Sequence, residues 1–123
     1  MTSQIIFQSI NVLTQNIHHA NVLVGWWDDI LVSDTNIVPA KLALVHSEIS
    51  EALEGHRKDL MDDKLPHRKM VEVELADAMI RIMDLAGALK LDLGGAIKEK
   101  LEFNASRADH KRENRKSVGG KKY

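Results

Sequence analysis

The stretch "KMVEVELADAMIRIMDLAGAL", residues 69–89, decides the fold of this chain. When its residues are placed at about 100° per step around a helix axis, apolar side chains cover most of the circumference and only Glu72 interrupts them. The other charged residues form one narrow stripe: Glu74, Asp77, Arg81 and Asp84. A helix of this kind is typical of the buried centre of a helical protein, so its charged stripe must face solvent or line a polar cleft.

We expect this central helix to span about residues 67–89. Three more helices are predicted, at about residues 4–24, 39–58 and 93–109. We expect Ser3 and Asp92 to cap the first and the last of them, and Pro39 to lie in the first turn of the second. The stretch "DLMDDKLP", residues 59–66, should break the second helix. The inward side chains of that helix are expected to be Leu42, Val45, Ile49, Ala52 and Leu53. The long connection at residues 25–38 holds both tryptophans. Without any strand pattern, the sequence predicts an all-α, four-helix bundle-like domain over residues 1–110.

The composition excludes several classes of site. The 123 residues include no cysteine, so a disulfide framework, a zinc–thiolate centre and a cysteine nucleophile are ruled out. The formal net charge of −1 argues against a bulk polyanion binder. We see no basic, apolar leader and no apolar run of about 18 residues, so we expect a cytoplasmic protein with no membrane partner.

A short chain with two large apolar faces gains stability by association, so we expect a homodimer or a homotetramer. Residues 111–123 form a basic tail that we expect to be mobile. This tail could close over phosphates, contact a partner subunit or touch nucleic acid weakly, but no specific nucleic acid is expected.

Two acidic pairs stand out on neighbouring helices. In "HSEISEALEGHRK", residues 46–58, Glu48 and Glu51 lie three residues apart, and Glu74 and Asp77 repeat this spacing on the next helix. Residues at this spacing share a helix face, so antiparallel packing would let the pairs converge. Converging carboxylates need a cation among them, and Mg²⁺, with Mn²⁺ as a substitute, fits oxygen ligands.

The alternative is that both pairs are solvated edges, with a local ion pair between Asp77 and Arg81; the charge pattern alone leaves the two interpretations about even. A diiron bundle is discounted, because no glutamate here has a histidine three residues later. Glu54 is an additional acid one turn on, and we do not count it as a ligand.

At "SEISE" (47–51), "ELAD" (74–77) and "KEKLEFNASR" (98–107), the chain resembles the MazG-like all-α nucleoside triphosphate pyrophosphatase superfamily. The resemblance covers roughly residues 20–110. It implies a MazG-type fold and Mg²⁺-dependent hydrolysis of a nucleoside triphosphate to the monophosphate and pyrophosphate. Carried over to this chain, it implies four metal ligands: Glu48, Glu51, Glu74 and Asp77. Ser47 stands where the family often has a further acid.

The resemblance also implies substrate contacts. Lys100, Asn104 and Arg107 share a helix face by spacing, and the resemblance directs Lys100 and Asn104 towards the phosphates. Otherwise they are surface residues of an amphipathic helix. In "NVLVGWWDD", residues 21–29, Trp26 or Trp27 could stack on a nucleobase, or one or both could plug the core or a subunit interface.

The expected reaction is metal-assisted hydrolysis of a (d)NTP at the α–β phosphoanhydride. Glu51 or Glu48 would accept the proton of the attacking water, and Lys100 would stabilise the charge that develops on the phosphates. The alternatives are a non-catalytic helical oligomerisation or nucleotide-sensing module, and a hydrolase of another nucleotide such as an alarmone.

Overall fold

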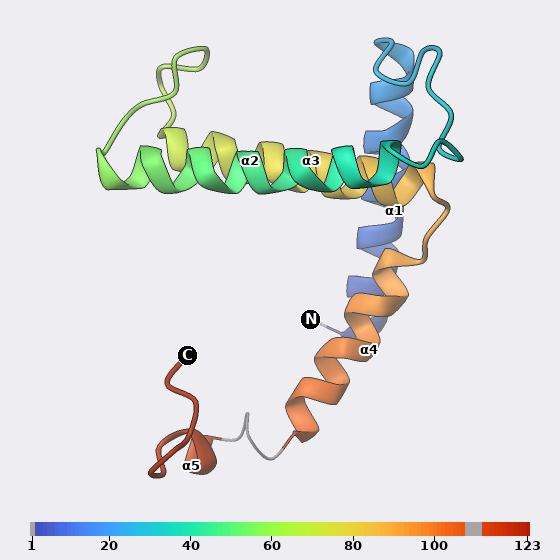
Figure 1. Ribbon diagram of the computed structural model, residues 1–123. Helices are drawn as coiled ribbons and strands as arrows, with labels where there is room; N and C mark the ends of the chain where they lie inside the picture. The colour runs from blue at the N-terminus through green and yellow to red at the C-terminus, as the bar shows by residue number, and fades with distance from the viewer. Residues whose placement is uncertain (1, 108–111) are drawn as a thin grey trace. The chain divides into compact units, whose positions relative to one another are not determined.

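The computed structural model of the protein describes residues 2–107 and 112–123. Within these ranges the chain is helical and has no strand, apart from an isolated bridge between Met61 and Lys69. The helices are α1 (Ser3–Leu23), α2 (Ile37–Arg57), α3 (Met70–Ala88), α4 (Leu93–Ser106) and α5 (Arg112–Arg115), as Figure 1 shows. The predicted all-α class is confirmed. None of the described helices is long and apolar enough to cross a membrane.

The N-terminal caps of α1 and α4 are both set by short polar side chains. Thr2 rather than Ser3 caps α1, because the Thr2 hydroxyl oxygen accepts a hydrogen bond from the Ile5 N–H at 3.3 Å. Ser3 is already the first helical residue, so the predicted cap was wrong by one position. Asp92 caps α4 as predicted, since its Oδ1 accepts a hydrogen bond from the Gly95 N–H at 2.9 Å.

The helix bounds differ from the prediction by a few residues. Pro39 lies in the first turn of α2, as expected. α3 begins at Met70 rather than near residue 67, because the preceding residues form a looped connection. α4 ends at Ser106, earlier than expected. Residues 108 and 109 of the predicted helix lie outside the described residues, as does the first residue of the predicted tail.

The described chain divides into two compact units, and α1 contributes residues to both of them. One unit spans Leu13–Leu91 and contains α2 and α3, while the other combines Met1–Val12 with Asp92–Tyr123. The single domain predicted over residues 1–110 and the mobility of the tail stay predictions.

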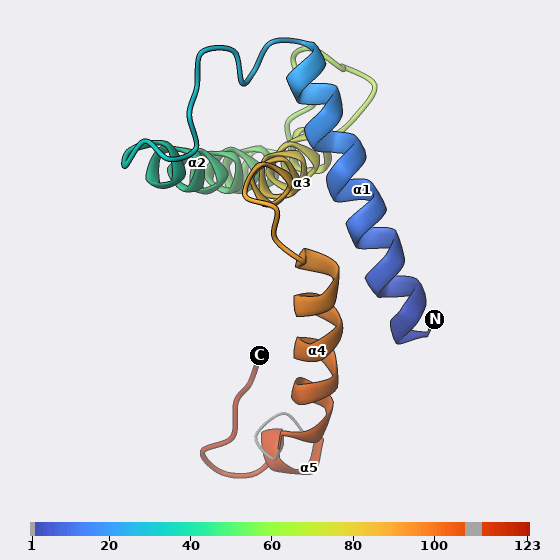
Figure 2. The same ribbon diagram turned by 90° about the vertical axis from the view of Figure 1, so that its right-hand side faces the viewer.

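The Leu13–Leu91 unit is built on an antiparallel hairpin in which α2 and α3 lie side by side (Figures 1 and 2). Small residues at the contact, such as the buried Ala52 and Ala78, let the two helices approach closely. The end of α3 also lies against α1, where a Cβ on Gly87 would come within 2.6 Å of the His18 Cβ. A larger residue at position 87 would therefore push α1 away from α3.

The apolar faces of α2 and α3 are not oriented as the sequence suggested. Leu42, Ile49 and Leu53 were expected to point inward, but about half of each is exposed. The α2 face towards α3 instead carries Glu48, Ala52 and Gly55, which follow one another at helical spacing and are buried. On α3 the expected all-round burial is also wrong, since several large apolar side chains are exposed: Leu75, Met79 and Ile82.

The other unit is held at the start of α4 by a polar bridge. Asn11 Nδ2 donates to Asp92 Oδ1 at 2.7 Å, and the Gly94 N–H donates to Asn11 Oδ1 at 2.8 Å. Gly94 is required at this contact, because a Cβ there would collide with the carbonyl oxygen of Phe7. The bridge therefore satisfies one of the unpaired N–H groups of the helix start and joins α1 to α4 within this unit.

Candidate metal centre

Carboxylates from α2 and α3 meet at the inner face of the hairpin. Oxygen atoms of Glu48, Glu74 and Asp77 all lie within 4.8 Å of one another. Glu48 comes from α2, while Glu74 and Asp77 are one turn apart on α3. Glu48 and Glu74 are buried, so the interpretation that both acidic pairs are solvated edges is wrong for these two residues. The predicted convergence of the two helices' acids is therefore present for these three side chains.

The three carboxylates open into a hollow of about 420 Å³. Its acidic lining residues are Glu48, Glu51, Asp62, Asp63, Glu74 and Asp77. Lys64 is the one cation among the lining residues that the structure describes. Glu51 is exposed and lies outside the tight trio, so it occupies the rim of the hollow, where water can reach it.

Arg81 pairs with a member of the trio. Its Nε donates to Glu48 Oε1 at 2.8 Å, and both side chains are largely buried. The local ion pair considered between Asp77 and Arg81 is therefore replaced by an ion pair between α3 and α2. Burial raises the pKa of Glu48, but its hydrogen bonds with Arg81 and the Glu74 carboxyl outweigh burial and bring the pKa below the usual value.

Glu74 is the acid of the cluster whose pKa is raised furthest. Burial, followed by the neighbouring carboxyl groups of Glu48 and Glu51, raises the pKa of Glu74 to about 8. Its Oε2 is buried and accepts no hydrogen bond within the described part of the chain. Burial and the charge of Glu48 also raise the pKa of Asp77, against the opposing effect of Arg81. A cation among these oxygens would relieve both effects.

The donor set fits a hard divalent cation. Oxygen ligands from one glutamate on α2 and two acids on α3 are spaced closely enough to share one ion, and an unsatisfied Glu74 oxygen is available as a ligand. Mg²⁺ commonly takes one or two carboxylates and keeps several waters. The hollow beyond the trio leaves room for such waters.

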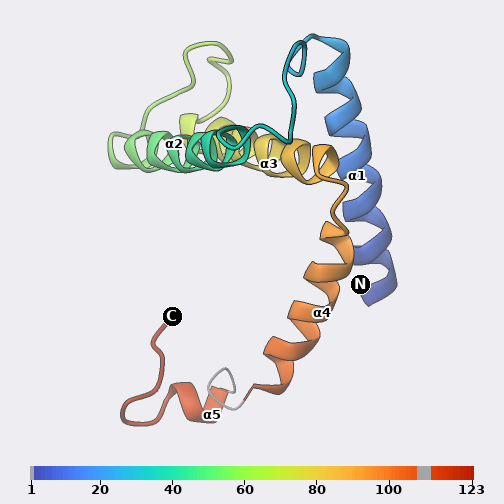
Figure 3. The same cartoon turned by 45° about the vertical axis from the view of Figure 1, so that its right-hand side comes forward.

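Sequence reasoning missed the contribution of the loop between α2 and α3, which it treated only as a break. This loop is the arch that Figure 3 shows at one end of the hairpin. Asp62 is buried, and its Oδ2 accepts hydrogen bonds from the N–H groups of Lys64 at 3.0 Å and Leu65 at 2.8 Å. The available signal was the acid-rich turn "DDKLP", residues 62–66, because aspartate often bonds to the backbone two residues on.

The two tryptophans have different surroundings. The indole N–H of Trp27 donates to both oxygens of the buried Asp84, at 2.9 and 3.1 Å, and His18 Nδ1 lies 2.7 Å from Asp84 Oδ1. Trp27 is half-buried and is thus anchored in the unit by polar contacts. Trp26 is 44% exposed, and its ring lies 5.5 Å from the Arg81 guanidinium carbon. Base stacking stays a prediction for either ring.

The predicted phosphate-binding residues lie on α4 and just after it, in the other unit. The Lys100 Nζ lies 5.0 Å and the Arg107 guanidinium carbon 5.6 Å from the Phe103 ring, so both cations lie beside one aromatic side chain. Arg107 follows the last residue of α4 and has an extended backbone, so it does not continue the helix face of Lys100. Asn104 Oδ1 is buried and accepts no hydrogen bond from the residues that the structure describes. Their phosphate-binding role stays a prediction.

The resemblance described above rests on three motifs, and the hairpin brings acids of two of them together, from "SEISE" and "ELAD". In comparisons with known proteins, the chain matches no family model, no curated protein and no solved structure.

Proposed function

We propose that this protein is a Mg²⁺-dependent nucleoside triphosphate pyrophosphohydrolase that converts a (d)NTP to the (d)NMP and pyrophosphate. The observation that carries the proposal is the meeting of Glu48, Glu74 and Asp77 oxygens within 4.8 Å at the mouth of a hollow. The resemblance to MazG-like pyrophosphatases supports the same reaction. The cytoplasm, where such triphosphates and Mg²⁺ are abundant, is the proposed location.

In the proposed mechanism, Glu48, Glu51, Glu74 and Asp77 would hold Mg²⁺, with Mn²⁺ as a substitute. The ion would neutralise the triphosphate and lower the pKa of a bound water. Glu51, at the exposed rim of the hollow, accepts the proton as the water oxygen bonds to the α-phosphorus. The bond between this phosphorus and the bridging oxygen breaks, and its electron pair leaves with pyrophosphate.

The cations of the chain would act on the phosphates. Lys64 already lines the hollow, and its ammonium group can neutralise a phosphate oxygen that approaches the acidic trio. Lys100, Asn104 and Arg107 are proposed to bind phosphate oxygens, on the strength of the resemblance. Arg81 keeps Glu48 ionised through the 2.8 Å hydrogen bond, and a bound cation would share or displace this bond.

The proposal includes assembly into a homodimer or a homotetramer. Leu42, Ile49 and Leu53 lie on α2 at helical spacing, and each is about half exposed in the single chain. A stripe of large apolar side chains on this scale is typical of a protein interface. Light scattering after size-exclusion chromatography tests this, and a strictly monomeric protein at micromolar concentration would contradict it.

The reaction is tested by incubating the purified protein with each NTP and dNTP, in Mg²⁺ and in EDTA, and separating the products by ion-exchange chromatography. We expect monophosphate and pyrophosphate in Mg²⁺ only. Diphosphate plus orthophosphate would indicate a different phosphohydrolase. Nucleotide binding without turnover would indicate a sensing module, and neither binding nor turnover would refute the proposal.

Glu51→Gln and Glu54→Gln form a matched pair for this assay, because they remove the same charge one turn apart on α2. Glu51 lines the hollow, whereas Glu54 pairs with Lys58 at 2.6 Å along the helix edge. Loss of a general base typically costs about 10²–10⁴-fold in rate, so Glu51→Gln should lower kcat by this amount while Glu54→Gln retains activity. Equal activity of the two variants would remove Glu51 from the mechanism.

A further inference from the structure

The basic segment of residues 112–123 folds into a hairpin-like turn. α5 ends at Arg115, and the Gly120 N–H donates to the Ser117 carbonyl oxygen at 3.0 Å. Gly119 has φ of 81°, a left-handed conformation that favours glycine. A Cβ on Gly120 would collide with the carbonyl oxygen of Asn114. The two glycines therefore allow the last residues of the chain to return alongside α5.

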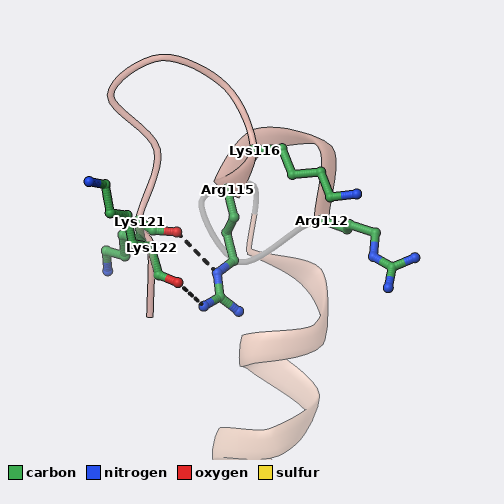
Figure 4. Close-up of a pocket in the computed structure, with 5 residues that line it drawn as sticks. All are labelled: Arg112, Arg115, Lys116, Lys121 and Lys122. Carbon is green, nitrogen blue, oxygen red and sulfur yellow. Dashed lines mark hydrogen bonds between the residues drawn. The ribbon is translucent and has the colours of Figure 1, made fainter.

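Two hydrogen bonds from the Arg115 side chain hold this returning segment in place. The Arg115 Nε donates to the carbonyl oxygen of Lys121 and the Nη2 donates to that of Lys122, both at 3.2 Å (Figure 4). Both bonds run from one planar guanidinium to backbone oxygens of consecutive residues. This fork is specific to arginine, because a lysine ammonium presents a single point of charge.

The fold-back surrounds a hollow of about 310 Å³ with positive charge. Its lining residues are Arg112, Arg115, Lys116, Lys121 and Lys122. They are all the lysines and arginines of residues 112–123, whereas the single acid of that range, Glu113, is not among them. Like charges gathered around one space repel each other, whereas a merely solvated tail would keep them apart. The arrangement is therefore suited to an anion placed between them.

The charge and shape of the hollow limit the kind of anion. Charge-assisted hydrogen bonds from arginine and lysine are strongest with phosphate and carboxylate oxygens. None of the lining residues that the structure describes is aromatic, so they offer no stacking platform of the kind with which proteins hold single-stranded nucleic acid. A compact, multiply charged anion matches five cations around one space better than an extended strand does.

We propose that this hollow binds a phosphoanhydride chain, such as inorganic pyrophosphate, tripolyphosphate or the triphosphate group of a nucleotide. The lining residues that the structure describes all belong to residues 112–123, and the site does not depend on the proposed hydrolytic reaction. Its function would be to capture the phosphate chain itself, without reading a base.

The test is isothermal titration of the full chain with pyrophosphate, tripolyphosphate, ATP and a single-stranded oligonucleotide, all in EDTA so that no Mg²⁺ acts at the carboxylates. Lys121→Gln/Lys122→Gln should weaken pyrophosphate binding by about tenfold or more. Lys69→Gln/Lys90→Gln removes the same charge from exposed residues outside the hollow, and it should change binding by less than about twofold. Similar affinity for pyrophosphate and ATP would mean that the phosphate chain alone is recognised, from either source.

Arg115→Lys distinguishes a structured binding site from a simple accumulation of positive charge. It keeps the charge but removes the two guanidinium hydrogen bonds that hold the returning segment. We expect it to weaken binding by about tenfold. The proposal is overturned by the absence of pyrophosphate binding, by equal losses in both double variants, or by unchanged affinity in Arg115→Lys. Preference for the oligonucleotide over every phosphate chain would also overturn it and identify a nucleic-acid contact.

Discussion

Arg81 on α3 donates from Nε to Oε1 of Glu48 on α2 at a distance of 2.8 Å, beside the other carboxylates of the candidate metal centre. The pair fixes the register of the hairpin at the centre and lowers the total negative charge there. It also places one guanidinium where Mg²⁺ would compete for the same Glu48 carboxylate. Protein stability and metal binding should therefore be coupled at this residue.

Arg81→Gln should destabilise the protein in EDTA by about 1–3 kcal/mol, because it leaves the buried Glu48 carboxylate without its charged donor. Mg²⁺ should then raise the Tm of Arg81→Gln more than that of the unmodified protein, since the ion replaces the missing positive charge. Thermal unfolding in EDTA and in Mg²⁺ measures both effects.

Arg68→Gln is the control, because Arg68 and Glu72 form an exposed ion pair at 2.6 Å. Exposed pairs contribute little, so its stability should stay within about 0.5 kcal/mol of the unmodified protein. Similar losses in the two variants would show that the Arg81–Glu48 bond has no special part in the hairpin.

The raised pKa of Glu74 predicts how stability depends on pH. The folded carboxyl keeps its proton up to about pH 8, whereas the ordinary value is 4.5. The stability from this group is therefore complete below about pH 4.5 and is lost as pH rises through 8. In EDTA, the free energy of unfolding should fall between pH 6 and pH 9 by less in Glu74→Gln than in the unmodified protein. Parallel curves would contradict the assignment.

The same group predicts proton release on metal binding, because a carboxylate ligand must be ionised. At pH 7 the Glu74 carboxyl is largely protonated, so Mg²⁺ should displace its proton and bind more tightly as the pH approaches 8. Titrations in buffers of different ionisation enthalpy measure the number of protons released. A value that is near zero at pH 7, or unchanged in Glu74→Gln, would show that Glu74 is not the group displaced.

The acid stripe of α3 could be predicted from sequence because it depends only on helix geometry. Glu74, Asp77 and Arg81 share a face wherever the helix is placed, and their convergence with Glu48 follows once α2 runs antiparallel to α3. The cap at Asp92 and the place of Pro39 in the first turn of α2 could also be predicted, because each depends only on residues that are close in sequence.

The predictions that were wrong depend on contacts between segments that are distant in sequence. The burial of Glu48 in place of Ile49 follows from the close approach of α2 and α3, which favours small residues and the Arg81 pair over large apolar side chains. The pairing of Arg81 with Glu48 rather than Asp77, and the placement of Asp62 beside the hollow, likewise arise only when α2, α3 and their loop are brought together.

Asp62 should serve the site in two separable ways. Asp62→Ala removes the acceptor of the Lys64 and Leu65 N–H groups and should cost about 1 kcal/mol of stability. Asp62→Asn keeps an oxygen acceptor for these bonds and should lose much less stability, while removing a negative charge from the lining of the hollow. Thermal unfolding and Mg²⁺ titration of both variants separate the two roles. Equal stability of the alanine and asparagine variants would show that the turn does not depend on these hydrogen bonds.

The two tryptophans should respond differently to substitution. Trp27→Phe removes the indole N–H that bonds to the buried Asp84 carboxylate, and a hydrogen bond to a charged group contributes about 1.5–3 kcal/mol. Trp26 is 44% exposed, so Trp26→Phe should leave stability within about 0.5 kcal/mol. If Trp26 stacks on the nucleobase, Trp26→Ala should raise KM about tenfold or more, with kcat much less affected. An unchanged KM would remove Trp26 from the substrate site, and a stable Trp27→Phe would show that the bond to Asp84 does not anchor the loop.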